Sequence, residues 1–193
     1  MSPTPNNIAP GAGFGIRATA RIIDAIYGLV VAMVAAFLAG ILVAFLEEAG
    51  VVAAGWEGAR RGLDLPLWGA SVVGTLLYQS LTEGMSGASL GKLLCGLRVT
   101  SQTVQPIGFT QAFKRSLAFY WDGLFFGLVG YLSMKKSDLN QRYGDHWART
   151  VVAKASDVPP EAKRGGGMFA LAFTLGSVAK AICIALGLIL CIL

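Results

Sequence analysis

The sequence predicts an all-α membrane protein, a small helical bundle with about three full transmembrane spans, a re-entrant or interfacial helix pair and a short β element. Hydrophobic residues make up 54% of the 193 residues, charged residues only 14%, and the mean hydropathy is +0.61. Soluble domains average about 25% charged residues, so this chain has too little polar surface to cover a water-soluble core. The 25 glycines suit helices that approach one another closely in lipid.

Three apolar runs are the predicted spans. The first, residues 22–46, is about 37 Å long as a helix and exceeds the ~7–15 residues of a secretory signal core, which predicts an uncleaved anchor. The second, residues 66–82, carries polar side chains at steps of three and four, on one face that we expect to contact other helices. The third, residues 168–193, has Lys180 near its middle. The polar residues of the second span are Ser71, Thr75, Tyr78, Gln79 and Thr82.

Residues 116–134 allow two interpretations. As one helix, all of these residues would just cross the membrane, but Asp122 would then lie in lipid. The apolar part after Asp122 is only about 18 Å long as a helix, whereas the hydrocarbon core of the membrane is about 30 Å thick. If the segment instead enters and returns, Lys180 lies in the last span and only Arg60 and Arg61 lie outside, leaving thirteen of the sixteen Lys/Arg residues inside. Because short cytoplasmic loops are rich in Lys and Arg, we expect a re-entrant or interfacial pair and a cytoplasmic N-terminus.

The rest of the chain divides at changes in composition. Residues 1–16 form a flexible N-terminal tail, 17–154 the membrane domain, 155–167 a Pro/Gly-containing linker, and 168–193 an additional C-terminal transmembrane helix. Three short β-like runs lie within the membrane domain, and we expect them to pair in a small sheet at the cytoplasmic membrane surface. These runs are residues 97–102, 104–108 and 149–154.

Several function classes are disfavoured. The net charge of +5 comes from basic residues beside apolar spans, where membrane lipids are the expected partner and nucleic acid is not. Three cysteines without C-x-x-C spacing and a single histidine predict no metal site. The segment Gly87–Lys92 lacks P-loop spacing, because Ser86 and Leu93 stand where Gly and Ser/Thr are needed. We expect no cofactor and no enzymatic activity.

Ionisable residues near the spans are the main functional signal. Arg21 and Asp24 share a helix face, either as an interfacial ion pair or as part of an ion-handling site, since charged groups in lipid are costly and usually functional. Above them, Gly28 begins a row of small residues every four positions, which predicts close helix packing. The remainder of that row is Ala32, Ala36, Gly40 and Ala44.

Four motifs follow one another along the chain: Ala18-x-x-Arg21-x-x-Asp24; Glu83 with Gly87-Ala88-Ser89-Leu90-Gly91-Lys92 and Gly96-Leu97-Arg98-Val99; Arg115 with Asp122; and Gln141-Arg142-x-Gly144-Asp145 with Ala148-x-Thr150-Val151-Val152. In this order they resemble the RDD family, named for an arginine and two aspartates. The resemblance covers about residues 14–154, and the last span lies outside it. Two positions depart from the family pattern: no proline follows Asp122 within a few residues, and Arg149 replaces a small residue.

The resemblance implies two classes of function. Some members of the family carry out cation/proton exchange, so the first hypothesis is transport of a small ion or solute, for which so few spans would need a homo-oligomer. Other members are attached to membrane machinery, so the alternative is a non-catalytic scaffold or assembly subunit with a membrane-protein partner. We expect a location in the bacterial inner (plasma) membrane, with several passes.

Ten residues are the candidates for motif or ion-handling roles. Asp145 is expected to pair with Arg21, Arg115 or Arg142, and His146 to modulate that pair near neutral pH. Lys92 is expected to meet lipid phosphates or cap backbone carbonyls. The candidates are Arg21, Asp24, Glu83, Lys92, Arg115, Asp122, Arg142, Asp145, His146 and Lys180.

Overall fold

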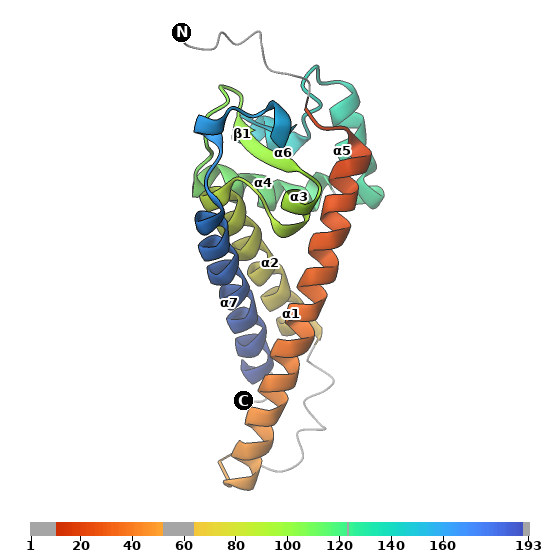
Figure 1. Cartoon of the computed structure of the whole chain (residues 1–193). Helices are drawn as coiled ribbons and strands as arrows, with labels where there is room; N and C mark the ends of the chain where they lie inside the picture. The colour runs from red at the N-terminus through yellow and green to blue at the C-terminus, as the bar shows by residue number, and fades with distance from the viewer. Residues whose placement is uncertain (1–10, 52–63, 123, 191–193) are drawn as a thin grey trace.

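The computed structural model describes residues 11–51, 64–122 and 124–190, and it has a long helical bundle with a small cap at one end (Figure 1). The chain leaves the cap along α1 (Phe14–Glu48), returns along α2 (Asp64–Ser86) and leaves again along α7 (Gly166–Leu190). Close approach of α2 and α7 depends on small residues: a Cβ added to Gly176 would lie 3.2 Å from the ring of Tyr78. The three predicted apolar runs therefore form three bundled helices.

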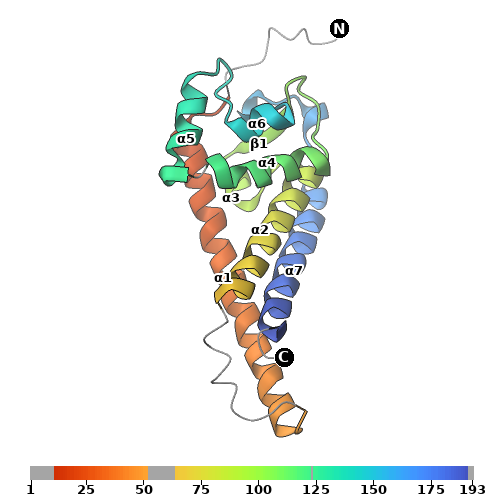
Figure 2. The ribbon, with the colours of Figure 1, turned by 180° about the vertical axis from the view of Figure 1, so that it is seen from behind.

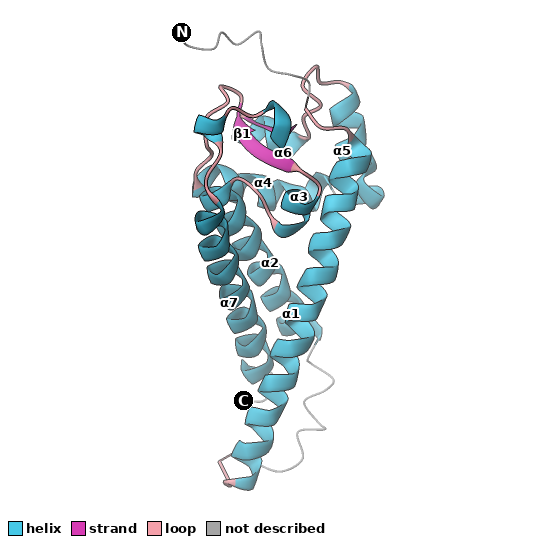
Figure 3. Cartoon of the chain, viewed as in Figure 1, coloured by secondary structure: helices cyan, strands magenta, loops and turns pink. Residues whose placement is uncertain are grey.

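The cap is built from the short elements between α2 and α7. Figure 3 shows its two strands, β1 (Leu97–Ser101) and β2 (Thr150–Lys154), which pair antiparallel with Leu97 opposite Lys154 and Ser101 opposite Thr150. Apolar side chains of both strands are buried in the core of the cap, which reaches Ala20 at the start of α1. The other cap elements are α3 (Leu90–Leu94), α4 (Phe109–Asp122), α5 (Leu124–Lys135), α6 (Tyr143–Ala148) and the 3₁₀ turns η3 (Ala155–Asp157) and η4 (Pro160–Ala162).

The predicted small sheet is confirmed for two of its three runs. The run 104–108 is not a strand and contributes only a single bridge between Pro106 and Thr100. Val104 has a positive φ of 57°, which no regular strand contains. Pro106 has no N–H to donate to a ladder. The local backbone therefore turns here instead of extending the sheet.

Two of the described helices are long and apolar enough to cross a membrane. They are α1, with a mean hydropathy of 2.9 in its most apolar window, and Pro160–Leu188, which includes most of α7, with 2.0. The predicted span at 66–82 is more polar and does not qualify by composition alone, although α2 packs along α7. Three residues of the predicted inward face, Tyr78, Gln79 and Thr82, are buried. The chain is therefore a mostly helical integral membrane protein.

The segment 116–134 does not form one straight helix. α4 and the part of α5 from Gly127 to Lys135 meet at 110°, and together they would make a third span only if this bent pair were counted as one. Viewed from behind in Figure 2, α4 lies across the cap end of α2, and α5 stays beside the first turns of α1. This arrangement agrees with the predicted re-entrant or interfacial pair.

The row of small residues predicted on α1 packs against the bundle only at the start of the row. Gly28 is buried, but Ala36 and Gly40 are exposed, and the buried positions are instead Ala35, Ala39 and Val43. A row of every fourth residue rotates by about 40° per step around a helix of 3.6 residues per turn. The row therefore leaves the contact with the bundle after about one turn.

Candidate functional site: a buried charge cluster between bundle and cap

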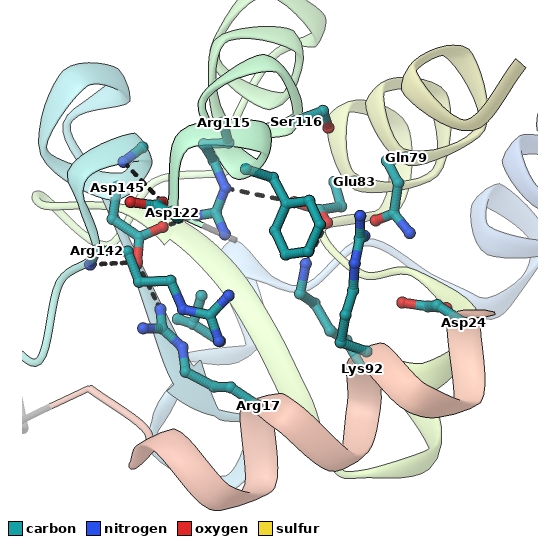
Figure 4. A pocket seen from close by; sticks show the side chains of 14 residues that line it. Arg17, Asp24, Gln79, Glu83, Lys92, Arg115, Ser116, Asp122, Arg142 and Asp145 are labelled. Atoms are coloured by element: carbon teal, nitrogen blue, oxygen red, sulfur yellow. Dashed lines mark hydrogen bonds and ion pairs between the residues drawn. The ribbon is translucent and has the colours of Figure 1, made fainter. Parts of the chain in front are cut away.

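Charged side chains from the bundle and the cap meet around a cavity of about 60 Å³ (Figure 4). We call the nine that line it the charge cluster. They come from α1, α2, α3, α4 and α6 with its N-cap residue, so the site exists only where the cap docks onto the bundle. The charge cluster consists of Arg17, Arg21, Asp24, Glu83, Lys92, Arg115, Asp122, Arg142 and Asp145.

Asp24 fastens α1 to the turn that begins α3. Its Oδ2 accepts a hydrogen bond of 2.6 Å from the Ser89 hydroxyl, and its Oδ1 accepts one of 2.8 Å from the backbone N–H of Gly91. Ser89 is also the N-cap of α3. Gly91 lies directly against the backbone of Ala20, where any Cβ would collide with the carbonyl oxygen. The Gly-rich motif is thus a helix-docking element.

Glu83 near the end of α2 is held by two cations. Lys92 Nζ bonds to its Oε1, and Arg115 Nε lies 3.4 Å from its Oε2. The side-chain amide of Gln79 lies between Glu83 and Arg21. In the orientation that satisfies both neighbours, its nitrogen donates to Glu83 Oε1 at 3.0 Å and its oxygen accepts from Arg21 Nη1 at 2.9 Å. Burial lowers the pKa of Lys92, an effect that the charge of Glu83 opposes. Glu83 therefore connects α2 to α3 and α4.

Asp145 is the most strongly paired acid of the cluster. Arg17 Nη2 donates to its Oδ2 at 2.6 Å, and Arg115 Nη1 lies 3.0 Å from its Oδ1. The same Oδ2 accepts from the backbone N–H of Arg142 at 3.1 Å, which caps the first turn of α6. Burial alone would raise the pKa of Asp145, but the charges of Arg115 and Arg17 hold this pKa well below its usual range. Asp145 is therefore a carboxylate at neutral pH.

Within the described part of the chain, Asp122 is the one acid of the cluster with an oxygen that has neither a hydrogen bond nor an ion pair. Its Oδ2 accepts a bond of 3.2 Å from the Gly144 N–H, while its Oδ1 is buried without a hydrogen-bond partner. Gly144 is required by close packing, because an added Cβ would lie 3.0 Å from Ala118. Asp122 thus retains one acceptor that faces the cavity region.

Arg21 and Arg142 have no ion pair within the described part of the chain. Arg21 stacks its guanidinium 3.7 Å from the ring centre of Phe119, and Arg142 lies 5.8 Å from that of Phe14. Burial and the nearby charge of Arg17 lower the pKa of Arg142 to about 10, so it is still a cation at neutral pH. By formal charge, the five basic and four acidic side chains give the cluster one positive charge in excess.

Eight of the ten predicted candidates lie in this cluster, and two do not. His146 is exposed on α6, on the side facing away from the buried Asp145. Lys180 is buried in the bundle instead, where its ammonium lies against Gly28 of α1, one turn from Asp24. Sequence reasoning missed Arg17, Gln79 and Ser89 as members of the site. The signal for Arg17 was its position four residues before Arg21, on the face that also carries Asp24.

Two predicted pairings are corrected by the structure, and a third is confirmed for one of its arginines. Arg21 and Asp24 do not form an ion pair, since the two oxygens of Asp24 bind Ser89 and Gly91. Lys92 bonds to Glu83 and not to lipid phosphates or backbone carbonyls. The predicted pairing of Asp145 with Arg115 is correct, whereas its second arginine is Arg17. In the first two cases a buried partner within the chain replaces the expected contact.

The fold and this cluster define an integral membrane protein whose charged residues gather where the cap meets the bundle. The model of the RDD family matches residues 11–149, and the chain belongs to this family. The match includes seven of the eight described helices and strands before η3, and ends just before β2. No curated protein and no solved structure matches the chain. Among the described residues, no group of three His, Cys, Asp or Glu side chains is arranged to hold a metal ion.

Proposed function

We propose that this RDD-family protein transports a small ion across the membrane, with exchange of a proton at a buried carboxylate. The observation that carries the proposal is a series of buried ionisable groups from mid-bundle into the cap: Lys180, then Asp24, and beyond it the rest of the charge cluster. Ionisable side chains inside a membrane bundle are costly to bury and usually mark ion pathways or proton relays.

Asp122 is the carboxylate best suited to exchange a proton for a cation. The oxygens of Asp24, Glu83 and Asp145 are engaged by donors or cations of the chain. Among the described acids of the charge cluster, only Asp122 retains an oxygen with neither a hydrogen bond nor an ion pair. Oε2 of Glu83 also lacks a hydrogen bond, but it lies 3.4 Å from Arg115 Nε. Binding a cation or a proton at that oxygen breaks no existing hydrogen bond, so no donor has to be displaced and binding is not weakened by the loss of one.

The size of the cavity limits the transported species. A cavity of about 60 Å³ has room for only a few water-sized groups. We therefore propose a single small ion, with little of its hydration shell, as the transported species. No step of this proposal is catalytic, and we propose that the protein is not an enzyme.

Proton flux in reconstituted vesicles tests the proposal. Purified protein in vesicles with an internal pH dye is given a gradient of Na⁺ or K⁺, and we expect a cation-dependent change of internal pH. Asp122→Asn should abolish it, whereas Asp138→Asn, which removes the same charge from an exposed loop, should leave it unchanged. Absence of flux in the wild type, or full flux in Asp122→Asn, contradicts the proposal.

The distribution of basic residues supports a location in a bacterial inner membrane with the cap on the cytoplasmic side. α4 and α5 both lie at the cap end, where α1 and α7 also begin. Basic residues of the cap elements, such as Lys135 and Lys136, thus lie together on one side of the bundle. Such an excess of Lys and Arg is typical of cytoplasmic segments.

A second candidate, the non-catalytic assembly subunit, is favoured by the far half of α1. Figure 1 shows α1 extending past the end of α7, and its side chains there are apolar and exposed, including Phe37 at 69% and Phe45 at 66%. Such a surface suits either lipid or another membrane helix, from a second copy or another protein. Extraction in mild detergent followed by mass measurement distinguishes them: a stoichiometric foreign partner favours assembly, and a homo-oligomer favours transport.

A further inference from the structure

A second, larger cavity of about 260 Å³ adjoins the charge cluster. It lies between α1, α4 and α5, and it shares Arg21, Phe119, Asp122 and Arg142 with the first cavity. Its remaining lining is apolar or glycine, and comes mainly from one face of α1. The two cavities together therefore form an amphipathic space, with an apolar outer part and charged groups at its inner wall.

The charged groups at that wall include both arginines without an ion pair. In the described part of the chain no carboxylate lies within ion-pair distance of Arg21 or Arg142, and Nε of Arg142 is buried without a partner. Their ring contacts with Phe119 and Phe14 use the guanidinium faces. Arg21 Nη1 donates to the Gln79 amide oxygen. The remaining guanidinium N–H groups of both arginines stay available, in the forked geometry that binds phosphate oxygens.

The apolar part of the space borders the surface of α1 that faces lipid. Ile22 lines it and is 60% exposed, and it is followed on the same helix by exposed Ile26 and Leu29. Arg21 lies at the start of this apolar stretch, which is the depth at which headgroup phosphates lie in a bilayer. A lipid can therefore enter from the side, with its phosphate at the level of the arginines.

We propose that this space binds one anionic phospholipid, its phosphate between Arg21 and Arg142 and an acyl chain along Ala18 and Ile22. Two guanidinium groups face one carboxylate, Asp122, so the wall still has a net positive charge of one. The free oxygen of Asp122 accepts a hydrogen bond from a hydroxyl of the headgroup. The proposal does not depend on transport, because binding needs only the arginines and the apolar wall.

Native mass spectrometry of the purified full chain in mild detergent tests the inference, with dioleoyl phosphatidylglycerol, dioleoyl phosphatidylcholine and inorganic phosphate as probes. We expect one phosphatidylglycerol per chain, at least about tenfold tighter than phosphatidylcholine. Arg21→Gln and Arg142→Gln should each weaken it by about tenfold or more. The charge-matched control Lys136→Gln, at an exposed position, should have no effect.

A second variant keeps the test decisive if an arginine variant does not fold. Ala18→Leu fills the apolar part of the space without changing charge, and it should weaken phosphatidylglycerol binding severalfold while the chain stays folded. Equal binding of both lipids overturns the proposal, as does unchanged binding in a folded arginine variant. Displacement of phosphatidylglycerol by inorganic phosphate at equal concentration shows a site for free oxyanions, and likewise overturns it.

Discussion

Arg17 in the first turn of α1 and Asp145 in α6 form an ion pair of 2.6 Å, although 128 positions separate them in the sequence. Both side chains are almost fully buried, with 4% and 3% of their surface exposed. Because Arg115 binds the other oxygen of Asp145, the carboxylate joins α1, α4 and α6. This contact is a principal means by which the cap is attached to the bundle.

Asp145→Asn should therefore destabilise the protein by about 3–5 kcal/mol, because it leaves Arg17 and Arg115 buried with one negative charge fewer. The unfolding free energy in detergent measures this change, and Asp138→Asn, in an exposed loop, is the control. Arg17→Gln combined with Asp145→Asn should cost less than the sum of the two single changes, because the double variant removes both charges. Strict additivity would argue against a direct pair.

The same residue should give the protein a characteristic acid sensitivity. Since the pKa of Asp145 is held below that of an unfolded aspartate, about 3.9, the folded state binds fewer protons, and its stabilising contribution is present above that pH. The contribution falls as the pH drops from about 4 towards the folded pKa. The difference in unfolding free energy between wild type and Asp145→Asn should be constant from pH 7 to about 5 and shrink below 4. A constant difference down to pH 3 would contradict this assignment.

Much of the architecture follows from the sequence because lipid restricts what a chain can do. Long apolar runs must be helices in a bilayer, and the basic residues around 116–134 favoured a segment that does not cross. The motif residues were correctly expected to gather, since costly charges in an apolar chain need partners. The predicted ranges 1–16 and 168–193 fall partly on residues outside the described structure, and the predicted outer residues Arg60 and Arg61 lie wholly outside it.

The pairings inside the cluster could not be predicted, because partner choice depends on tertiary geometry. Arg17, Arg21, Arg115 and Arg142 are equivalent in sequence as partners of Asp145, and only the docking of α6 selects Arg17 and Arg115. His146 follows Asp145 directly, but a step of about 100° on a helix points it outward. The strand predicted at 104–108 failed for a local reason, the positive φ of Val104.

Gly91→Ala should destabilise the protein by about 1–3 kcal/mol, an overpacking cost. The added Cβ would collide with the Ala20 carbonyl, so α3 must move away from α1 and stretch both hydrogen bonds of Asp24. Gly40→Ala is the matched control, since it lies on α1 with nothing near the added Cβ. In a helix interior this control should be neutral or stabilising by up to about 1 kcal/mol. Thermal unfolding in detergent measures both variants, and equal effects would refute the packing role.

Labelling of single cysteines should place Ser137 and Ala49 on opposite sides of the membrane. Cys95, Cys183 and Cys191 are first replaced by serine, and Ser137→Cys and Ala49→Cys are then made separately. Ser137 lies just after α5 at the cap, and Ala49 caps the far end of α1. In intact cells a membrane-impermeant maleimide should label Ala49→Cys only, and Ser137→Cys should react after permeabilisation. Labelling of both in intact cells would contradict the proposed orientation.

Lys180→Met should separate function from stability. Lys180 is buried in the bundle, and no hydrogen bond or ion pair of its ammonium is formed within residues 11–51, 64–122 and 124–190. Removing a charge that is buried in a membrane and unpaired should leave the melting temperature unchanged or raise it, because the cost of burying it disappears.

If Lys180 sets the charge beside Asp24 on an ion pathway, cation-dependent proton flux should nevertheless fall at least about tenfold. Lys136→Met, at an exposed position, is the control and should change neither quantity. A lower melting temperature with normal flux would instead make Lys180 a structural residue, and the ion pathway would then have to end at Asp24.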